Sequence, residues 1–117
     1  MAIKTVGYGG ETIILPNHSI SRGRKRCNKK GKSIVRFAKK SLAYGLNFDN
    51  AEGRLLEFIK SKYQCYYDAN AIQVYGHDVY VFKRKFNTYI LKTVLDLPKP
   101  LWEYWDEYSR SMKEETE

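Results

Sequence analysis

Apolar, β-branched and aromatic residues dominate the stretch from Ala71 to Pro98, AIQVYGHDVYVFKRKFNTYILKTVLDLP. Two breaks interrupt it, Gly76-His77-Asp78 and Phe86-Asn87. Runs of such residues between turn residues are typical of strands. The pattern therefore predicts a meander of three antiparallel strands. Its central strand contains Val79–Phe82, because a continuous apolar run is expected where both faces of a sheet are covered.

A shorter apolar segment, Thr12 to Leu15, lies near the N-terminus and is closed by Pro16-Asn17. Glycines interrupt the residues before it, so residues 1–10 are expected to be a flexible lead-in. We expect Thr12–Leu15 to join the meander as a fourth strand, because a three-stranded sheet of this hydrophobicity would leave an edge open.

Helical periodicity marks two segments between these apolar regions. The first runs from Lys29 to Leu42, with Gly45 where a C-terminal cap belongs. The second runs from about Ala51 to Tyr63 behind a capping residue, Asp49 or Asn50. The first helix has an apolar inner face and a basic outer face, formed by Lys32, Arg36, Lys39 and Lys40.

A third helical pattern follows the prolines that end the meander. Leu101 to about Met112 is expected to form a short amphipathic helix, with Trp102 and Trp105 docked on the core. The last residues, KEETE at 113–117, are expected to be a frayed acidic tail.

Length and composition predict one domain spanning residues 1–117. The chain has 117 residues, of which 43% are apolar and 15% aromatic, and this suffices for a hydrophobic core. Together with the patterns above, this predicts an α+β fold in which an antiparallel sheet of three or four strands packs against N-terminal helices, with a short C-terminal helix.

Cysteine content and hydropathy bear on the compartment and on metals. The sequence has two cysteines and two histidines without metal-ligand spacing, so we expect no metal site and no cofactor. It contains no apolar run long enough to cross a bilayer and no signal-peptide pattern. We therefore expect a cytoplasmic protein with no membrane partner. Oligomeric state is not predicted.

Charge is distributed unevenly along the chain. The net charge is +8, but residues 1–102 carry 19 basic and 7 acidic side chains, whereas residues 103–117 carry 2 and 6. No acidic residue lies between Glu11 and Asp49, an interval that holds ten Lys or Arg residues. Such a field attracts polyanions and gains affinity by counterion release. The alternative is that these side chains are merely solvated.

Two groups of cations are candidates for binding a nucleic acid or an acidic or nucleoprotein host target. The second group protrudes at the turn after the meander's central strand. It either joins the first group in one continuous groove or only protects an edge strand from aggregation. The first group comprises Arg24, Lys25, Lys32, Arg36, Lys39 and Lys40, and the second comprises Lys83, Arg84 and Lys85.

A third candidate is a stripe of His18, Arg22 and Arg26 in the segment HSISRGRKR. Spacings of four residues would place an imidazole and two guanidinium groups along one helix face. This pattern indicates a phosphate-binding or catalytic site. Alternatively, His18 covers the core and the arginines pair with carboxylates elsewhere.

Three motifs, HSISRGRKR, IQVYGHDVYVF and LKTVLDLP, resemble those of small proteins of Firmicute phages and prophages that look like distant relatives of the RelE and BrnT ribonuclease toxins. The resemblance covers about Leu15 to Pro98. The matching positions are His18, Arg22, Arg26, Tyr75, Gly76, Thr93, Val94, Leu97 and Pro98.

The resemblance implies a RelE/BrnT-like α+β fold and metal-independent RNA cleavage by attack of the ribose 2′-hydroxyl. Such chemistry needs a proton acceptor, cations for the developing charge and an acid for the leaving oxygen. The resemblance would make His18 or His77 the base or acid and Tyr89 an alternative proton donor. Arg22, Arg26 and Arg84 would stabilise charge. By its position next to Asp78, His77 also fits a plain turn residue.

Four functions remain open. The sequence favours a module that binds nucleic acid or a nucleoprotein complex, because the charge signal is strong and the catalytic set incomplete. The alternatives are an anti-CRISPR-like inhibitor of a host defence nuclease, acting by protein–protein binding, and an endoribonuclease of the toxin–antitoxin type. A structural or assembly role in a virion or in a homodimer is favoured only if Trp102 and Trp105 are exposed.

Overall fold

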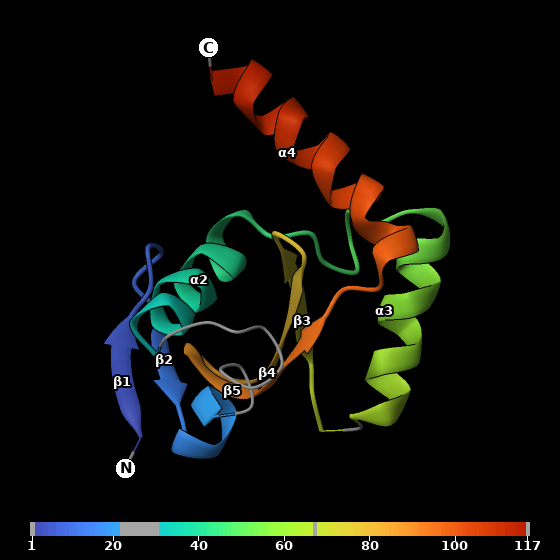
Figure 1. The fold of residues 1–117 in the computed structure, drawn as a ribbon. Helices are drawn as coiled ribbons and strands as arrows, with labels where there is room; N and C mark the ends of the chain where they lie inside the picture. Colours follow the sequence, from blue (N-terminus) through green and yellow to red (C-terminus); the bar gives the residue numbers. More distant parts are fainter. Residues whose placement is uncertain (1, 22–30, 67, 117) are drawn as a thin grey trace.

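Five strands form a mixed sheet at the centre of the protein (Figure 1). The computed structural model describes residues 2–21, 31–66 and 68–116. The strands lie in the order β1-β2-β5-β4-β3. The predicted meander is confirmed, and it provides the last three strands. The bounds are β1 Ile3–Val6, β2 Thr12–Leu15, β3 Ala71–Tyr75, β4 Asp78–Lys85 and β5 Thr88–Asp96.

Helices cover both faces of the sheet, which confirms the α+β class (Figure 1). Helix α2, Gly31–Tyr44, packs on one face. Helices α3, Gly53–Cys65, and α4, Trp102–Thr116, pack on the other face. A 3-10 turn, η1 at Lys99–Leu101, leads into α4, and residues 17–21 are also helical.

Strand β4 separates two hydrophobic cores because its side chains alternate between the two faces of the sheet. Tyr80 and Phe82 belong to the core under α2, together with Ile34 of that helix. Val79 and Val81 belong to the core under α3 and α4. These four residues, Val79–Phe82, are fully buried, as predicted for a strand covered on both sides. The middle strand of the sheet is nevertheless β5, because two further strands lie beyond it.

The sheet differs from the sequence-based expectation in two respects. Thr12–Leu15 joins it as predicted, but β2 runs parallel to β5, so the sheet is not purely antiparallel. A parallel pair requires a long connection, which the segment between β2 and β5 provides. In addition, Ile3–Val6 pairs antiparallel with β2 instead of forming a flexible lead-in. The sheet therefore has five strands and not three or four.

Two helix ends depend on contacts that are distant in the sequence. Gly45 follows α2 as predicted, and a Cβ there would lie 2.4 Å from the Ser41 carbonyl oxygen and 3.0 Å from the Val74 carbonyl oxygen of β3. The predicted capping of α3 by Asp49 or Asn50 is wrong. The hydroxyl of Tyr104 in α4 instead accepts a 3.2 Å hydrogen bond from the Arg54 amide in the first turn of α3.

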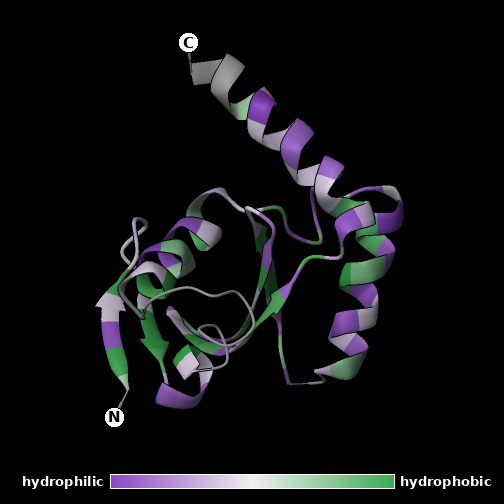
Figure 2. Cartoon of the chain, in the orientation of Figure 1, coloured by the Kyte–Doolittle hydropathy of each residue, from purple (hydrophilic) through white to green (hydrophobic). Residues whose placement is uncertain are grey.

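Helix α4 is docked by its first turns and projects from the body beyond them (Figure 1). Trp105 is 9% exposed, and the Trp102 indole donates a 2.7 Å hydrogen bond to the Leu97 carbonyl oxygen. The expected docking of both tryptophans is therefore confirmed. The projecting part is mostly hydrophilic (Figure 2). The helix extends to Thr116, past the expected end at Met112 and into the segment expected to fray.

Candidate nucleic-acid interface

The cations Lys83, Arg84 and Lys85 are the last three residues of β4, and all three are exposed. The sequence places them at a turn, but the turn consists of the next two residues, Phe86 and Asn87. We refer to Lys83–Asn87 as the hairpin tip. Because the three cations are in a strand, they point alternately to the two faces of the sheet.

Arg84 lies on the α2 face. Its guanidinium carbon is 5.6 Å from the ring centre of Tyr89, and Tyr89 packs against the core under α2. Lys83 and Lys85 therefore lie on the α3 face. The three neighbouring charges consequently do not form one patch. Of the three, only Arg84 lies on the face of the sheet that α2 covers.

Hydrogen bonds from both sides hold the hairpin tip. The Asn70 side chain donates to the Arg84 carbonyl oxygen over 2.9 Å and accepts from the Arg84 amide. The Arg84 side chain donates through Nε to the Phe86 carbonyl oxygen over 2.9 Å. On the other side, the Thr12 amide donates to the Asn87 carbonyl oxygen over 2.9 Å. The tip is thus fixed to β2 and to the start of β3.

A groove of about 350 Å³ lies beside the hairpin tip on the α2 face. Two cations from distant parts of the chain lie over tyrosines that line it. Arg84 lies over the ring of Tyr89, and Lys39 of α2 has its Nζ 6.0 Å from the ring centre of Tyr8. We refer to this site as the Tyr8–Tyr89 groove; it is lined by Tyr8, Gly9, Glu11, Leu42, Ala43 and Tyr89.

Glu11 is the acidic residue among those that line the Tyr8–Tyr89 groove. The loop before it wraps closely around its carboxylate. A Cβ at Gly7 would lie 1.9 Å from Glu11 Oε1, and a Cβ at Gly9 would lie 2.7 Å from Glu11 Oε2. Glycine at these two positions therefore lets the loop backbone enclose this carboxylate.

The other predicted cations of α2 lie at different places. Arg36 is exposed, with its guanidinium carbon 5.0 Å from the ring centre of Phe37, and Lys40 is half-buried. The structure thus brings Lys39 and Arg84 to one groove. The Lys32 side chain and the residues Arg22, Arg24, Lys25 and Arg26 lie outside the described part of the chain.

The predicted stripe of His18, Arg22 and Arg26 is not assembled by the described residues. His18 is exposed, in the helical residues 17–21. Its neighbour Ser19 is fully buried and fixes this segment to β5, through a 2.6 Å hydrogen bond from its hydroxyl to the Leu91 carbonyl oxygen. The two arginines lie outside the described residues.

On the α3 face, a basic and an acidic side chain pair near the hairpin tip. Lys92 Nζ lies 2.9 Å from Asp68 Oδ2. The hydrogen bond from Lys92 holds the pKa of the Asp68 carboxyl below its ordinary value, and the charge of Lys83 acts in the same direction. Part of the positive charge on this face is therefore balanced within the chain.

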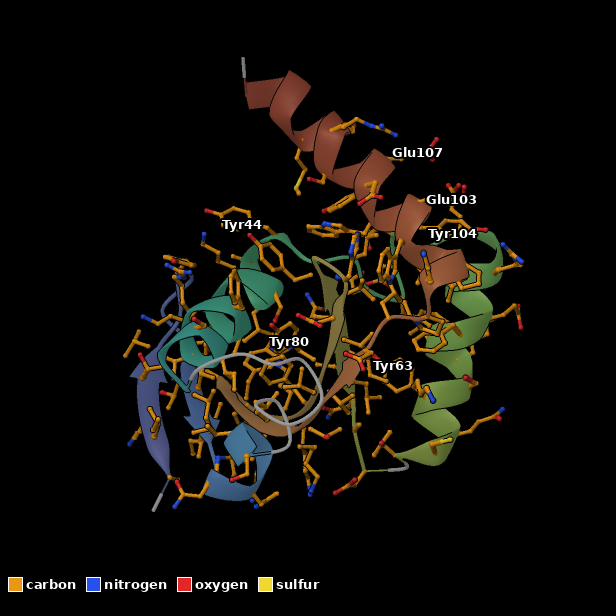
Figure 3. All side chains as sticks on the ribbon, in the orientation of Figure 1. Tyr44, Tyr63, Tyr80, Glu103, Tyr104 and Glu107 are labelled. Atoms are coloured by element: carbon orange, nitrogen blue, oxygen red, sulfur yellow. The ribbon has the colours of Figure 1, made fainter. Side chains whose placement is uncertain are left out.

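The opposite end of β4 and β5 is acidic. Asp78 faces Asp96 in the strand register, and His77 Nε2 lies 2.9 Å from Asp106 Oδ1 of α4. His77 is a turn residue, as its position predicts, and its ring stacks on Trp102 with centres 4.2 Å apart. Glu103 and Glu107 are exposed side chains of α4 (Figure 3). We refer to this region as the acidic end; it comprises Asp78, Asp96, Glu103, Asp106 and Glu107.

Neither a metal centre nor a membrane span is found in the part of the chain that the structure describes. No three His, Cys, Asp or Glu side chains come together within residues 2–21, 31–66 and 68–112. No helix among the described residues combines the length and apolar character needed to cross a bilayer.

Sequence reasoning missed two residues that matter for this site. Tyr8 lies in the segment expected to be a flexible lead-in, and its ring is one wall of the groove. The sequence pattern marks Phe86 only as a break between strands. In the structure it is the most exposed large apolar side chain among the described residues, at 86%. The signal for Phe86 is in the sequence, since an aromatic residue directly follows three cations.

Comparison with known proteins adds no relative. No protein-family model matches the chain, and no curated protein or solved structure matches it. The resemblance to phage proteins and to the RelE and BrnT toxins therefore stays a prediction.

Proposed function

We propose that the protein binds nucleic acid, free or within a nucleoprotein complex, through the hairpin tip and the Tyr8–Tyr89 groove. The observation that carries the proposal is a pair of cations held over the two tyrosines that line this groove. Arg84 and Lys39 come from β4 and α2, and each lies over a tyrosine ring. Lys83 and Lys85 extend the positive charge to the other face of the tip.

The positions of these cations favour phosphate binding more than their number does. A cation held over an aromatic ring has fewer conformations to lose when it contacts a phosphate. The planar guanidinium of Arg84 can also donate two hydrogen bonds to one phosphate. Contacts of this kind release counterions and do not depend on base sequence. The expected ligand is therefore a nucleic-acid backbone.

Binding without cleavage fits the groove better than ribonuclease activity. Cleavage by the 2′-hydroxyl requires a proton acceptor next to the cations that hold the phosphate. None of the described residues lining the Tyr8–Tyr89 groove is a histidine, and the carboxylate of Glu11, which could accept a proton, is enclosed by the loop at Gly7 and Gly9. His77, the second histidine of the chain, is engaged with Asp106 and Trp102 at the acidic end.

The direct test is binding of labelled RNA and DNA at low salt, followed by fluorescence anisotropy. We expect binding by the wild type and a severalfold loss of affinity in Arg84→Gln and in Lys39→Gln, on both ligands. Lys60→Gln is the matched control, because Lys60 is an exposed lysine of α3 that pairs with Glu57. No binding by the wild type, or an equal loss in all three variants, would overturn the proposal.

The acidic end supports a second candidate, an inhibitor of a host nuclease that acts by protein–protein binding. Helix α4 projects from the body, and its exposed carboxylates include those of Glu103 and Glu107 (Figures 1 and 3). Carboxylates on a protruding helix complement a channel built for nucleic acid. A host complex that survives nuclease treatment, and that is lost in Glu103→Lys/Glu107→Lys but kept in Arg84→Gln, would favour this candidate.

A further inference from the structure

Phe86 at the hairpin tip has two unusual features. Its side chain is 86% exposed, although it is a phenylalanine in a protein that buries most of its large apolar residues. Its backbone adopts φ 56°, in the left-handed region, and it is the only described residue other than glycine to do so. A bulky residue in this region is an outlier that suggests a functional reason.

The turn itself would accept glycine at position 86 more easily than phenylalanine. Lys85 pairs with Thr88, so Phe86 and Asn87 form a two-residue hairpin loop with positive φ at its first position only. Loops of this geometry prefer glycine at that position. Phenylalanine therefore raises the energy of the turn through its backbone and also exposes a ring to water. Neither effect benefits the free protein.

The backbone that carries the ring is nevertheless held in place. Arg84 Nε donates to the Phe86 carbonyl oxygen, and the Asn87 carbonyl oxygen accepts from the Thr12 amide. Both sides of the loop are therefore fixed while the ring points outward. An exposed aromatic ring on this held backbone, directly after Lys83, Arg84 and Lys85, provides a stacking surface next to phosphate-binding groups.

We propose that Phe86 stacks on an unpaired base of a single-stranded nucleic acid whose backbone contacts Arg84. This inference rests on the proposed function and narrows its ligand to single strands. Stacking of bases on aromatic side chains beside a basic track is how many proteins bind single strands without sequence preference. In an intact duplex the base faces are covered, so Phe86 would first have to separate a base step.

An anionic membrane is the other surface that attracts cations beside an aromatic ring. Binding of a bilayer surface requires several apolar side chains in one plane. At the hairpin tip Phe86 is alone, with Lys85 and Asn87 as its polar neighbours. The tip therefore fits a single base better than a lipid surface.

The test compares Phe86→Gly with Phe86→Trp. Three labelled ligands are used: a short single strand of mixed sequence, the same strand with abasic sites, and its duplex. We expect Phe86→Gly to lose about tenfold in affinity for the single strand, with little change for the abasic strand and the duplex. Phe86→Trp should retain the affinity. The salt dependence should not change, because no charge is altered.

Two controls separate this inference from the proposed function and from misfolding. Phe48→Ala removes another exposed phenylalanine, which packs on Tyr63 on the far side of the sheet, and should leave binding unchanged. Thermal unfolding of Phe86→Gly should occur at or above the wild-type temperature. If the wild type binds nucleic acid and Phe86→Gly binds the single strand equally well, only the role of Phe86 is overturned.

Two further outcomes would also overturn the inference. An equal loss of single-strand and duplex binding in Phe86→Gly would mean that the ring does not act on unpaired bases. Binding of anionic phosphatidylserine vesicles that depends on Phe86, without an effect on oligonucleotides, would assign the ring to a membrane surface. If the wild type binds none of the three oligonucleotides, the proposed function fails together with this inference.

Discussion

The two ends of the β4–β5 ladder use their charged and aromatic residues differently. At the acidic end, His77 stacks on Trp102 and contacts Asp106, so these groups dock α4 on the sheet. At the hairpin tip, Lys83 and Lys85 are exposed, and Arg84 lies over Tyr89 at the edge of a groove. Strand β4 has 8 residues, so the two ends lie roughly 24 Å apart.

This difference suggests a division between stability and binding. Contacts at the acidic end are made within the chain, and their loss should destabilise the fold. The hairpin tip carries an exposed ring with a left-handed backbone next to three cations, features that do not stabilise the isolated protein. Residues that are unfavourable for the fold and exposed are expected where a protein binds its ligand.

The largest expected effect is on stability, from Trp105→Ala at the acidic end. Trp105 is 9% exposed, and its ring centre lies 5.0 Å from that of Tyr75. Removing a buried tryptophan side chain should lower the free energy of unfolding by about 3 to 5 kcal/mol. Urea unfolding measures this, and Lys85→Ala is the control without a change in stability. A loss below about 1 kcal/mol would mean that α4 is not held by this contact.

A smaller loss is expected from Tyr104→Phe, which removes only a hydroxyl. The Tyr104 hydroxyl accepts the Arg54 amide at the start of α3, where the N-cap residue Glu52 makes no side-chain hydrogen bond. We expect the free energy of unfolding to fall by about 1 kcal/mol, again in urea unfolding. Tyr108→Phe, in the same helix, serves as the comparison. Equal effects in both variants would refute the capping role.

At the hairpin tip a stability change of opposite sign is expected. A left-handed backbone costs a residue with a side chain roughly 1 to 2 kcal/mol, and part of this is offset by the greater freedom of glycine in the unfolded chain. Phe86→Gly should therefore raise the free energy of unfolding by up to about 1 kcal/mol. Phe86→Ala keeps the strained position occupied and should not raise it. Destabilisation by Phe86→Gly would show that the ring supports the fold.

The smallest expected effect is on pH dependence, through Asp68 and Lys92. Lys92 lowers the pKa of Asp68 below its ordinary value of 3.8. A lowered pKa in the folded state contributes stability above the ordinary value, and this is lost as the pH falls through the folded-state pKa. In Lys92→Ala, we expect an NMR titration to show the Asp68 pKa moving up toward its ordinary value. An unchanged titration would mean that the contact is absent in solution.

Much of the fold follows from local patterns in the sequence. The meander was predictable because β-branched residues and two turns define β3, β4 and β5. The parallel pairing of β2 with β5 was not, because it joins residues separated by most of the chain. The strand Ile3–Val6 was missed because it is only 4 residues long and is followed by glycines.

The candidate site was predictable only as a set of charges. The sequence identifies Lys39 and Arg84 as basic, but it does not show that they flank one groove. That arrangement depends on Tyr8 and Tyr89, which are far apart in the chain and are brought together by the β1–β2 loop and the hairpin. Arg84 and Lys85 lie on opposite faces of the sheet because β4 continues to Lys85. The sequence pattern, which places these residues in a turn, does not predict this.

The salt dependence of binding tests the central claim most directly. The dissociation constant for a labelled single strand would be measured over a range of salt concentrations, for the wild type and for Arg84→Gln/Lys39→Gln. Each lost phosphate contact should reduce the slope of log K against log salt by about 0.7, so the double variant should show a slope shallower by about 1.4. A wild-type slope near zero, or an unchanged slope in the double variant, would contradict a nucleic-acid interface at this groove.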